Sequence, residues 1–125
     1  MKTGQTFTET KLFTQADFDE FARLSGDDNP IHVNPAFAVR TRFGRTVAHG
    51  MFLYSVICGA LNRYFPGAVQ LEQQLLFPAP TFADERLEIR IGVRQANEQQ
   101  LHVTTQILNE SGALTCDGEC VLAYG

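Results

Sequence analysis

The sequence is poor in several features that mark particular classes of protein. It has 125 residues, no tryptophan and only two lysines, and its 10 basic and 14 acidic residues give a formal net charge of −4. A chain of this length can form one domain with a real core but not two, so we expect a single domain over residues 1–125. A protein with this excess of negative charge lacks the basic surface that binds a nucleic-acid phosphate backbone, so we expect no nucleic-acid partner.

Long hydrophobic runs are also absent. The longest nearly unbroken apolar stretch runs from Met51 to Leu61 and already contains Ser55. It is shorter than the roughly 20 residues that a bilayer span requires, so we expect a buried helix there and no membrane partner. The N-terminal segment Met-Lys-Thr-Gly-Gln-Thr lacks the apolar centre of a secretory signal. We therefore expect a cytoplasmic protein.

Cysteine is scarce, and the three cysteines contain no Cys-x-x-Cys pair. This excludes a disulfide framework and a thiolate metal site, and we predict neither a metal nor a cofactor. Cys116 and Cys120 lie on an alternating segment, where we expect them to be buried as small apolar residues.

The first third of the chain predicts an edge strand and two helices. Residues 6–12 alternate weakly and are rich in threonine and phenylalanine, which favours an edge strand. A capping box, Thr-x-x-Asp at residues 14–17, predicts a helix that ends at Gly26. The Asn-Pro pair at residues 34–35 predicts a short helix that continues to about Val39.

Residues 50–64 predict the centre of the core. The segment is apolar around nearly its whole circumference, so a helix there must be covered on most sides by other elements. Four strand-like segments with alternating apolar residues follow, joined by hairpin-sized loops, at about residues 70–77, 87–93, 101–107 and 114–124. This order predicts an α+β fold with an antiparallel sheet curled around the helix. Two exposed sheet edges favour a homodimer over a monomer.

Most reactive side chains lie between residues 27 and 50. Asp27 and His32 are five residues apart, and the Asn-Pro pair between them can turn the chain and bring both into one cleft. A carboxylate and an imidazole in one cleft can serve as a general acid/base pair near neutral pH. The alternative is that Asp27 or Asp28 caps a helix and that His32 is a satisfied, half-buried histidine.

Gly50 lies where a polar segment meets the predicted central helix. The first amides of a helix have no partner inside it, and a glycine lets an oxygen atom approach them, which is the requirement of an oxyanion site. The alternative is that Gly50 only permits close packing of the helix start. His49 is a weaker candidate, whose alternative role is a hydrogen bond to a neighbouring loop.

Together, residues 21–32 and 43–51 resemble the hydratase-2 motif of MaoC-like (R)-specific enoyl-CoA hydratases. The resemblance rests on Ser-x-Asp-x-Asn-Pro-x-His, a downstream Phe-Gly, and Ala-His-Gly-Met at the start of the central helix, in the family's order and near its spacing. Residues 77–84 resemble a later segment of the family, although Ala83 stands where the family usually has glycine. The resemblance therefore covers most of the chain.

The resemblance implies a hot-dog fold, in which an antiparallel sheet wraps a long helix and two copies pair edge to edge with an acyl-CoA along the interface. It implies that Asp27 and His32 hold and activate a water for reversible syn addition to a trans-2-enoyl thioester, giving (R)-3-hydroxyacyl-CoA. It implies that the Gly50 amide polarises the thioester carbonyl. We place Asn29 and His49 among the substrate-binding residues.

At Cys58 the sequence departs from the family, whose members commonly carry a hydroxyl there that supports the catalytic aspartate. A thiol is a weaker hydrogen-bond donor. Ser55 lies three residues earlier on roughly the same helix face and is a candidate substitute. The alternative is that Cys58 is only a core residue. We predict that Cys58→Ser keeps or raises activity.

Arg40, Arg42 and Arg45 form a basic cluster close to both candidate sites. Arginine pairs well with phosphate oxygens, so these residues, Arg45 among them, are candidates for binding the CoA phosphates. A solvated loop is the alternative.

Two other functions fit the same residues. A 3-hydroxyacyl dehydratase acting on acyl carrier protein would use the same motif, although the scarcity of lysine favours free CoA thioesters over an acidic carrier. A noncatalytic hot-dog acyl-binding subunit would be expected to have lost Asp27 or His32. A hot-dog thioesterase would carry its carboxylate on the central helix, where residues 51–61 contain none.

Overall fold

The helices and strands follow the predicted order, with one additional short helix. The structure is a computed structural model that describes residues 2–124. Its elements are β1 (Thr6–Leu12), α1 (Gln15–Ser25), α2 (Pro30–Val33), α3 (Pro35–Ala38), α4 (Gly50–Tyr64), β2 (Ala68–Leu76), β3 (Arg86–Ala96), β4 (Gln100–Leu108) and β5 (Leu114–Tyr124).

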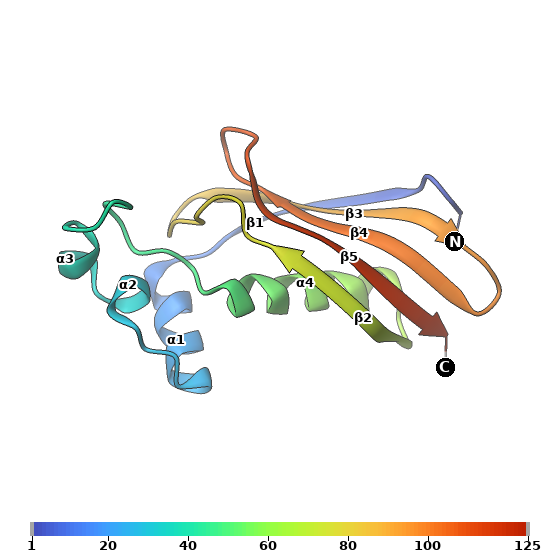
Figure 1. Cartoon of the computed structure of the whole chain (residues 1–125), viewed down its shortest axis with the longest axis horizontal. Helices are drawn as coiled ribbons and strands as arrows, with labels where there is room; N and C mark the ends of the chain where they lie inside the picture. The colour runs from blue at the N-terminus through green and yellow to red at the C-terminus, as the bar shows by residue number, and fades with distance from the viewer. Residues whose placement is uncertain (1, 125) are drawn as a thin grey trace.

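The five strands form one antiparallel sheet in the order β1-β3-β4-β5-β2. In Figure 1 the sheet lies over one side of α4, which runs along it. The inward residues of β3 and β4 alternate with partly exposed ones, and Ile89, Ile91 and Leu101 are fully buried, as is Ile57 of α4. The predicted α+β architecture with a sheet around a central helix is confirmed.

The short helices gather at one end of α4. Figure 1 shows α1, α2 and α3 beyond the N-terminal end of α4, with α3 farthest from it, while the sheet extends past the other end of that helix. Residues 27–49 therefore lie around the N-terminus of α4, where its unpaired amides are.

Local capping explains why the short helices begin where they do. The predicted capping box is present, since the Thr14 amide donates to the Asp17 carboxylate at 2.8 Å. The helix that the sequence analysis missed, α2, begins in the same way as α3. Asn29 Oδ1 accepts from the Ile31 amide, and Asn34 Oδ1 accepts from the Phe37 amide, each at 3.1 Å.

The two sheet edges differ in what they expose. The edge strand β1 is rich in threonine and charged residues and exposes one large apolar side chain, Leu12, whereas β2 exposes three, Val69, Leu71 and Leu76. Cys116 and Cys120 are buried on β5, as predicted. Within residues 2–124, no helix is both long enough and apolar enough to span a membrane.

Candidate active site

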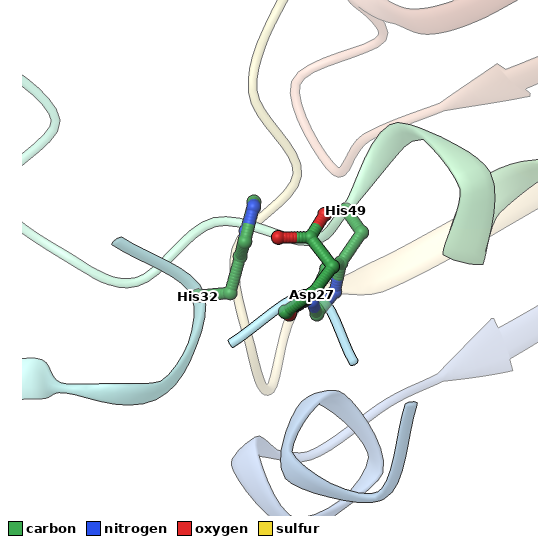
Figure 2. A group of neighbouring side chains, drawn as sticks. All are labelled: Asp27, His32 and His49. Carbon is green, nitrogen blue, oxygen red and sulfur yellow. Dashed lines mark hydrogen bonds between the residues drawn. The ribbon is translucent and has the colours of Figure 1, made fainter. Parts of the chain in front are cut away.

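Three side chains from different segments converge beside the first turn of α4. Asp27 lies between α1 and α2, His32 lies in α2, and His49 immediately precedes α4. One oxygen or nitrogen atom from each lies within 4.8 Å of those of the other two. The imidazole rings of His32 and His49 are stacked, with centroids 3.8 Å apart and planes 23° from parallel. Figure 2 shows the Asp27 carboxylate beside the two rings.

The His32 ring is held in one tautomer by a backbone carbonyl. Its Nδ1 lies 2.7 Å from the Val47 carbonyl oxygen, which can only accept, so Nδ1 carries the proton. The other nitrogen, Nε2, therefore has a lone pair when the ring is neutral. His32 is thus oriented as a hydrogen-bond acceptor or base.

His49 is buried and binds the backbone of Asp27. Its Nε2 lies 2.7 Å from the Asp27 carbonyl oxygen and donates to it. The side chain is 2% exposed and packs against the Phe21 ring. Burial lowers the pKa of His49, an effect that the bond to Asp27 opposes and the nearby His32 reinforces. The ring is therefore neutral at neutral pH.

Asp27 is exposed, and its hydrogen bonds within residues 2–124 run through its backbone. Its amide donates to Ser25 Oγ at 3.1 Å, and its carbonyl accepts from His49. The backbone is thereby fixed while the carboxylate remains available to a bound molecule.

The N-terminus of α4 lies next to this cluster because His49 directly precedes Gly50, the first residue of the helix. The Leu53 amide is bonded to the His49 carbonyl, so the amides of residues 50–52 precede the first intrahelical bond. Gly50 has room for a substituent only if the Phe77 ring moves, since a Cβ there would lie 2.8 Å from that ring. The position required for an oxyanion donor is thus present, with an aromatic ring against it.

Gln15 positions this region and was missed by the sequence analysis. Its Nε2 donates to the His32 carbonyl at 2.8 Å, and its Oε1 accepts from the buried Thr46 hydroxyl. One side chain of α1 therefore connects α2 to the segment before α4. No local pattern signals such a contact, because its partners lie 17 and 31 residues away.

Two predicted substrate-binding residues have other contacts in the structure. The Asn29 side chain caps α2. The Arg45 guanidinium donates to the Ala83 carbonyl at 2.7 Å and lies 4.7 Å from the Phe82 ring centroid. Both side chains hold the local backbone, and neither belongs to the three-residue cluster.

Ser55 and Cys58 are likewise not brought to Asp27. The Ser55 hydroxyl donates to the Phe52 carbonyl at 2.6 Å, and the residue lines a hollow with Lys11 and Phe13. Cys58 Sγ accepts from the Gln70 amide at 3.3 Å. The predicted support of the carboxylate by either side chain is therefore absent from the contacts of these residues.

Cys58 belongs instead to a polar group between α4, β2 and β5. The Tyr54 hydroxyl donates to Gln70 Oε1 at 2.7 Å, and Cys120 Sγ lies 3.9 Å from the same oxygen. Burial and the neighbouring Cys58 raise the pKa of Tyr54 to about 12, so this hydroxyl keeps its proton and remains a donor.

A carboxylate and two imidazoles are also ligand types for a divalent transition metal. Each ring has one nitrogen engaged with a carbonyl and one further nitrogen. By residue type, this cluster is where such an ion would bind.

Comparison with known proteins assigns the family. The family model described as a MaoC-like domain matches residues 1–112. The (R)-specific enoyl-CoA hydratase of Aeromonas caviae is 36% identical over 126 residues, which cover 98% of this chain and 94% of that protein. The mitochondrial 3-hydroxyacyl-[acyl-carrier-protein] dehydratase of Arabidopsis thaliana is 31% identical, covering 95% and 75%.

The structural comparison agrees. The solved (R)-hydratase from A. caviae, described as involved in PHA biosynthesis, has a TM-score of 0.94 at 36% identity, covering 100% of this chain and 98% of that one. These similar proteins are hydro-lyases by name, and the predicted hot-dog fold is shared with them. The chain therefore belongs to the MaoC-like domain family.

Proposed function

We propose that this protein reversibly hydrates trans-2-enoyl thioesters to (R)-3-hydroxyacyl thioesters. The observation that carries the proposal is that Asp27, His32 and His49 lie together, with one side-chain oxygen or nitrogen of each within 4.8 Å of the others. His49 directly precedes Gly50 in the chain. This proximity supports the proposal, because a water-activating pair and an oxyanion donor must act on the same substrate. The names of the similar proteins support the same reaction class.

In the proposed mechanism, Asp27 and His32 hold the attacking water. The carboxylate and the His32 Nε2 lone pair each accept a hydrogen bond from it, because His32 Nδ1 is engaged with Val47. As the water oxygen attacks C3, one of these groups takes its proton and delivers it to C2 from the same face. Hydroxyl and hydrogen are then added syn, and the same steps in reverse remove water. General acid/base help of this kind contributes about 10²- to 10⁴-fold in rate.

The Gly50 amide stabilises the charge that this attack produces. Electrons displaced from the double bond collect on the thioester oxygen, and an amide at a helix N-terminus carries the positive end of the helix dipole. The Phe77 ring packs where a Cβ of residue 50 would be, so this ring forms one wall of the position proposed for the thioester carbonyl. Removal of one such donor from other enzymes costs about 10²- to 10³-fold in rate.

His49 acts as a positioning residue. It binds the Asp27 carbonyl and stacks against His32, so it fixes both reacting groups relative to each other. Since burial keeps its pKa low, it adds no positive charge beside the bases at neutral pH.

The proposed substrate is an acyl-CoA, with an acyl carrier protein thioester as the second candidate. The Arabidopsis relative is named as a dehydratase of carrier-bound substrates, and the chemistry is the same in reverse. The two lysines of the chain provide little basic surface for an acidic carrier, which favours CoA.

We further propose that the protein is a homodimer paired through β2. This strand forms one edge of the sheet and exposes Val69, Leu71 and Leu76. An unpaired edge strand readily pairs with another strand, and pairing with a second copy would remove the backbone edge and these apolar side chains from water.

The test is loss of the conjugated enoyl-thioester absorbance with crotonyl-CoA and trans-2-octenoyl-CoA, followed by chiral analysis of the product. Formation of the (R) product, unchanged by EDTA, supports the proposal. Formation of the (S) product, or activity abolished by EDTA and restored by a metal, contradicts the mechanism. A folded protein with no turnover on CoA or carrier-protein thioesters contradicts the function.

A further inference from the structure

A groove of about 550 Å³ opens beside the N-terminus of α4. It lies between the loop that follows α3 and the segment that follows β2, and its volume is within the range of small-molecule sites. Its walls include Arg42, Phe43, Gly50, Phe77, Pro78 and Thr81. The groove therefore leads directly to the proposed oxyanion donor.

Arg42 is the charged residue in the lining of this groove. Its guanidinium carbon lies 4.8 Å from the centroid of the Phe43 ring, which also lines the groove. Stacking occupies one face of the guanidinium and leaves its N–H edge available for a bidentate acceptor. Among residues 2–124, the ion pairs are made by Arg23, Arg63, Arg90 and Arg94, so Arg42 remains free to pair with a ligand.

The other two arginines of the sequence cluster have different surroundings. Arg45 is engaged with the Ala83 carbonyl and the Phe82 ring. The guanidinium carbon of Arg40 lies 5.9 Å from the Phe37 ring centroid, and Arg40 does not line the groove. The sequence offered all three arginines as candidates for phosphate binding, but in the structure Arg42 alone of the three lines the groove.

We propose that this groove holds the pantetheine arm of the thioester substrate and that Arg42 binds the phosphate at the end of that arm. The inference rests on the proposed function, which places the thioester carbonyl at Gly50. From there the arm runs along an apolar groove to a phosphate, and a guanidinium matches phosphate geometry with charge-assisted hydrogen bonds. In a chain of net charge −4, Arg42 supplies the local positive charge that a phosphate requires.

The experiment compares substrates with and without this phosphate in Arg42→Gln. Arg40→Gln is the matched control, since it removes the same charge two residues away and outside the groove. Crotonyl-CoA and crotonyl-pantetheine carry the same reacting group, but only the first has a phosphate. Arg42→Gln should raise the KM for crotonyl-CoA about 10-fold with kcat nearly unchanged, the effect expected of a lost charged hydrogen bond. It should leave crotonyl-pantetheine unaffected.

Three results would overturn the inference. They are an unchanged KM for crotonyl-CoA, an equal loss with both substrates, and an equal loss in Arg40→Gln. An equal loss with both substrates would indicate that Arg42 shapes the groove or contacts the acyl group. If the wild-type protein turns over neither substrate, the proposed function itself fails, which is a distinguishable outcome.

Two further substrates identify which phosphate is bound. Crotonyl-4′-phosphopantetheine and the crotonyl carrier protein share the phosphate next to the pantetheine, and the inference predicts that Arg42→Gln weakens both. A loss confined to crotonyl-CoA would overturn this assignment. Rising salt should raise the wild-type KM for crotonyl-CoA more steeply than that of Arg42→Gln, because the contact is exposed and screened.

Discussion

The two ends of α4 both place a carboxylate beside basic or hydroxyl-bearing side chains, but they use it differently. At the C-terminal end, Glu9 of β1 accepts hydrogen bonds from the Arg63 guanidinium and from the Tyr64 hydroxyl, the latter at 2.7 Å. Burial alone would raise the pKa of Glu9, but these two partners outweigh it and lower the pKa. This carboxylate is engaged in linking β1 to the helix.

At the N-terminal end, the two histidines bind backbone carbonyls instead of the carboxylate. His32 donates to Val47 and His49 donates to the carbonyl of Asp27. The backbone is satisfied, and the Asp27 carboxylate and His32 Nε2 are left for a third molecule. The structural carboxylate of Glu9 thus has its partners within the protein, whereas Asp27, whose carboxylate we propose to be catalytic, is held through its backbone.

The largest predicted effect is that of His32→Gln. Loss of the Nε2 base should lower kcat by about 10²- to 10⁴-fold. Because His32 is half-buried and the glutamine is polar, the melting temperature should change little. His102→Gln, at an exposed histidine of β4, is the control and should keep full activity. Equal activity of the two variants in the enoyl-CoA assay would remove His32 from the mechanism.

Gly50→Ala should lower kcat at least about 10-fold, but by less than the 10²- to 10³-fold cost of losing an oxyanion donor completely. Its Cβ would lie 2.8 Å from the Phe77 ring, so the ring must move into the space proposed for the thioester. The double variant Gly50→Ala/Phe77→Ala should recover part of the rate, since the conflict is removed. A double variant no faster than Gly50→Ala would show that the methyl group acts in another way.

The pH dependence of stability should report on His49. Its pKa is lowered in the folded protein from 6.5, so the unfolded chain binds the proton more tightly. Stability should therefore fall as the pH drops through about 6.5 and below. Thermal melts between pH 8 and 5 should show a shallower decline in His49→Gln, although that variant melts lower at every pH because it loses buried packing. Parallel curves for the two proteins would contradict the assignment.

The smallest effect is expected for Glu9→Gln. The amide keeps a weaker bond to Tyr64 but loses the charge that pairs with Arg63. Because Arg63 is half exposed and its charge is screened, the loss should be about 1 kcal/mol, or about 4 °C in melting temperature. The kcat should not change. A substantial fall in kcat would erase the distinction between the two ends of α4.

Much of the fold could be predicted because its signals are local. The bounds of the central helix follow from an apolar segment ended by Pro66, and β1 and β5 follow from alternation. The helix α2 was missed because the pair Asn29-Pro30 was interpreted as a turn, although the same pair at residues 34–35 was interpreted as a helix start. The structure shows that both asparagines are N-caps.

The site was predictable where family resemblance marked it and not where long-range contacts decide it. The motif indicated Asp27 and His32 as the pair, and the structure brings them together with His49. His49, the weaker candidate, makes the hydrogen bond to a neighbouring loop that was its alternative role. The motif could not indicate that Gln15 connects α1 to the His32 carbonyl, or that Cys58 faces Gln70. Nor could it separate Arg42 from Arg45, because Phe82 and Ala83, which engage Arg45, lie about 40 residues further along the chain.

The most direct test of the account is a comparison of Asp27→Asn with Asp28→Asn in the hydration of crotonyl-CoA, with thermal melts of both. The two aspartates are adjacent and exposed, and asparagine preserves size while removing the base. The account predicts that Asp27→Asn loses about 10²-fold or more in kcat at an unchanged melting temperature, while Asp28→Asn is active. Comparable activity of the two variants would contradict it.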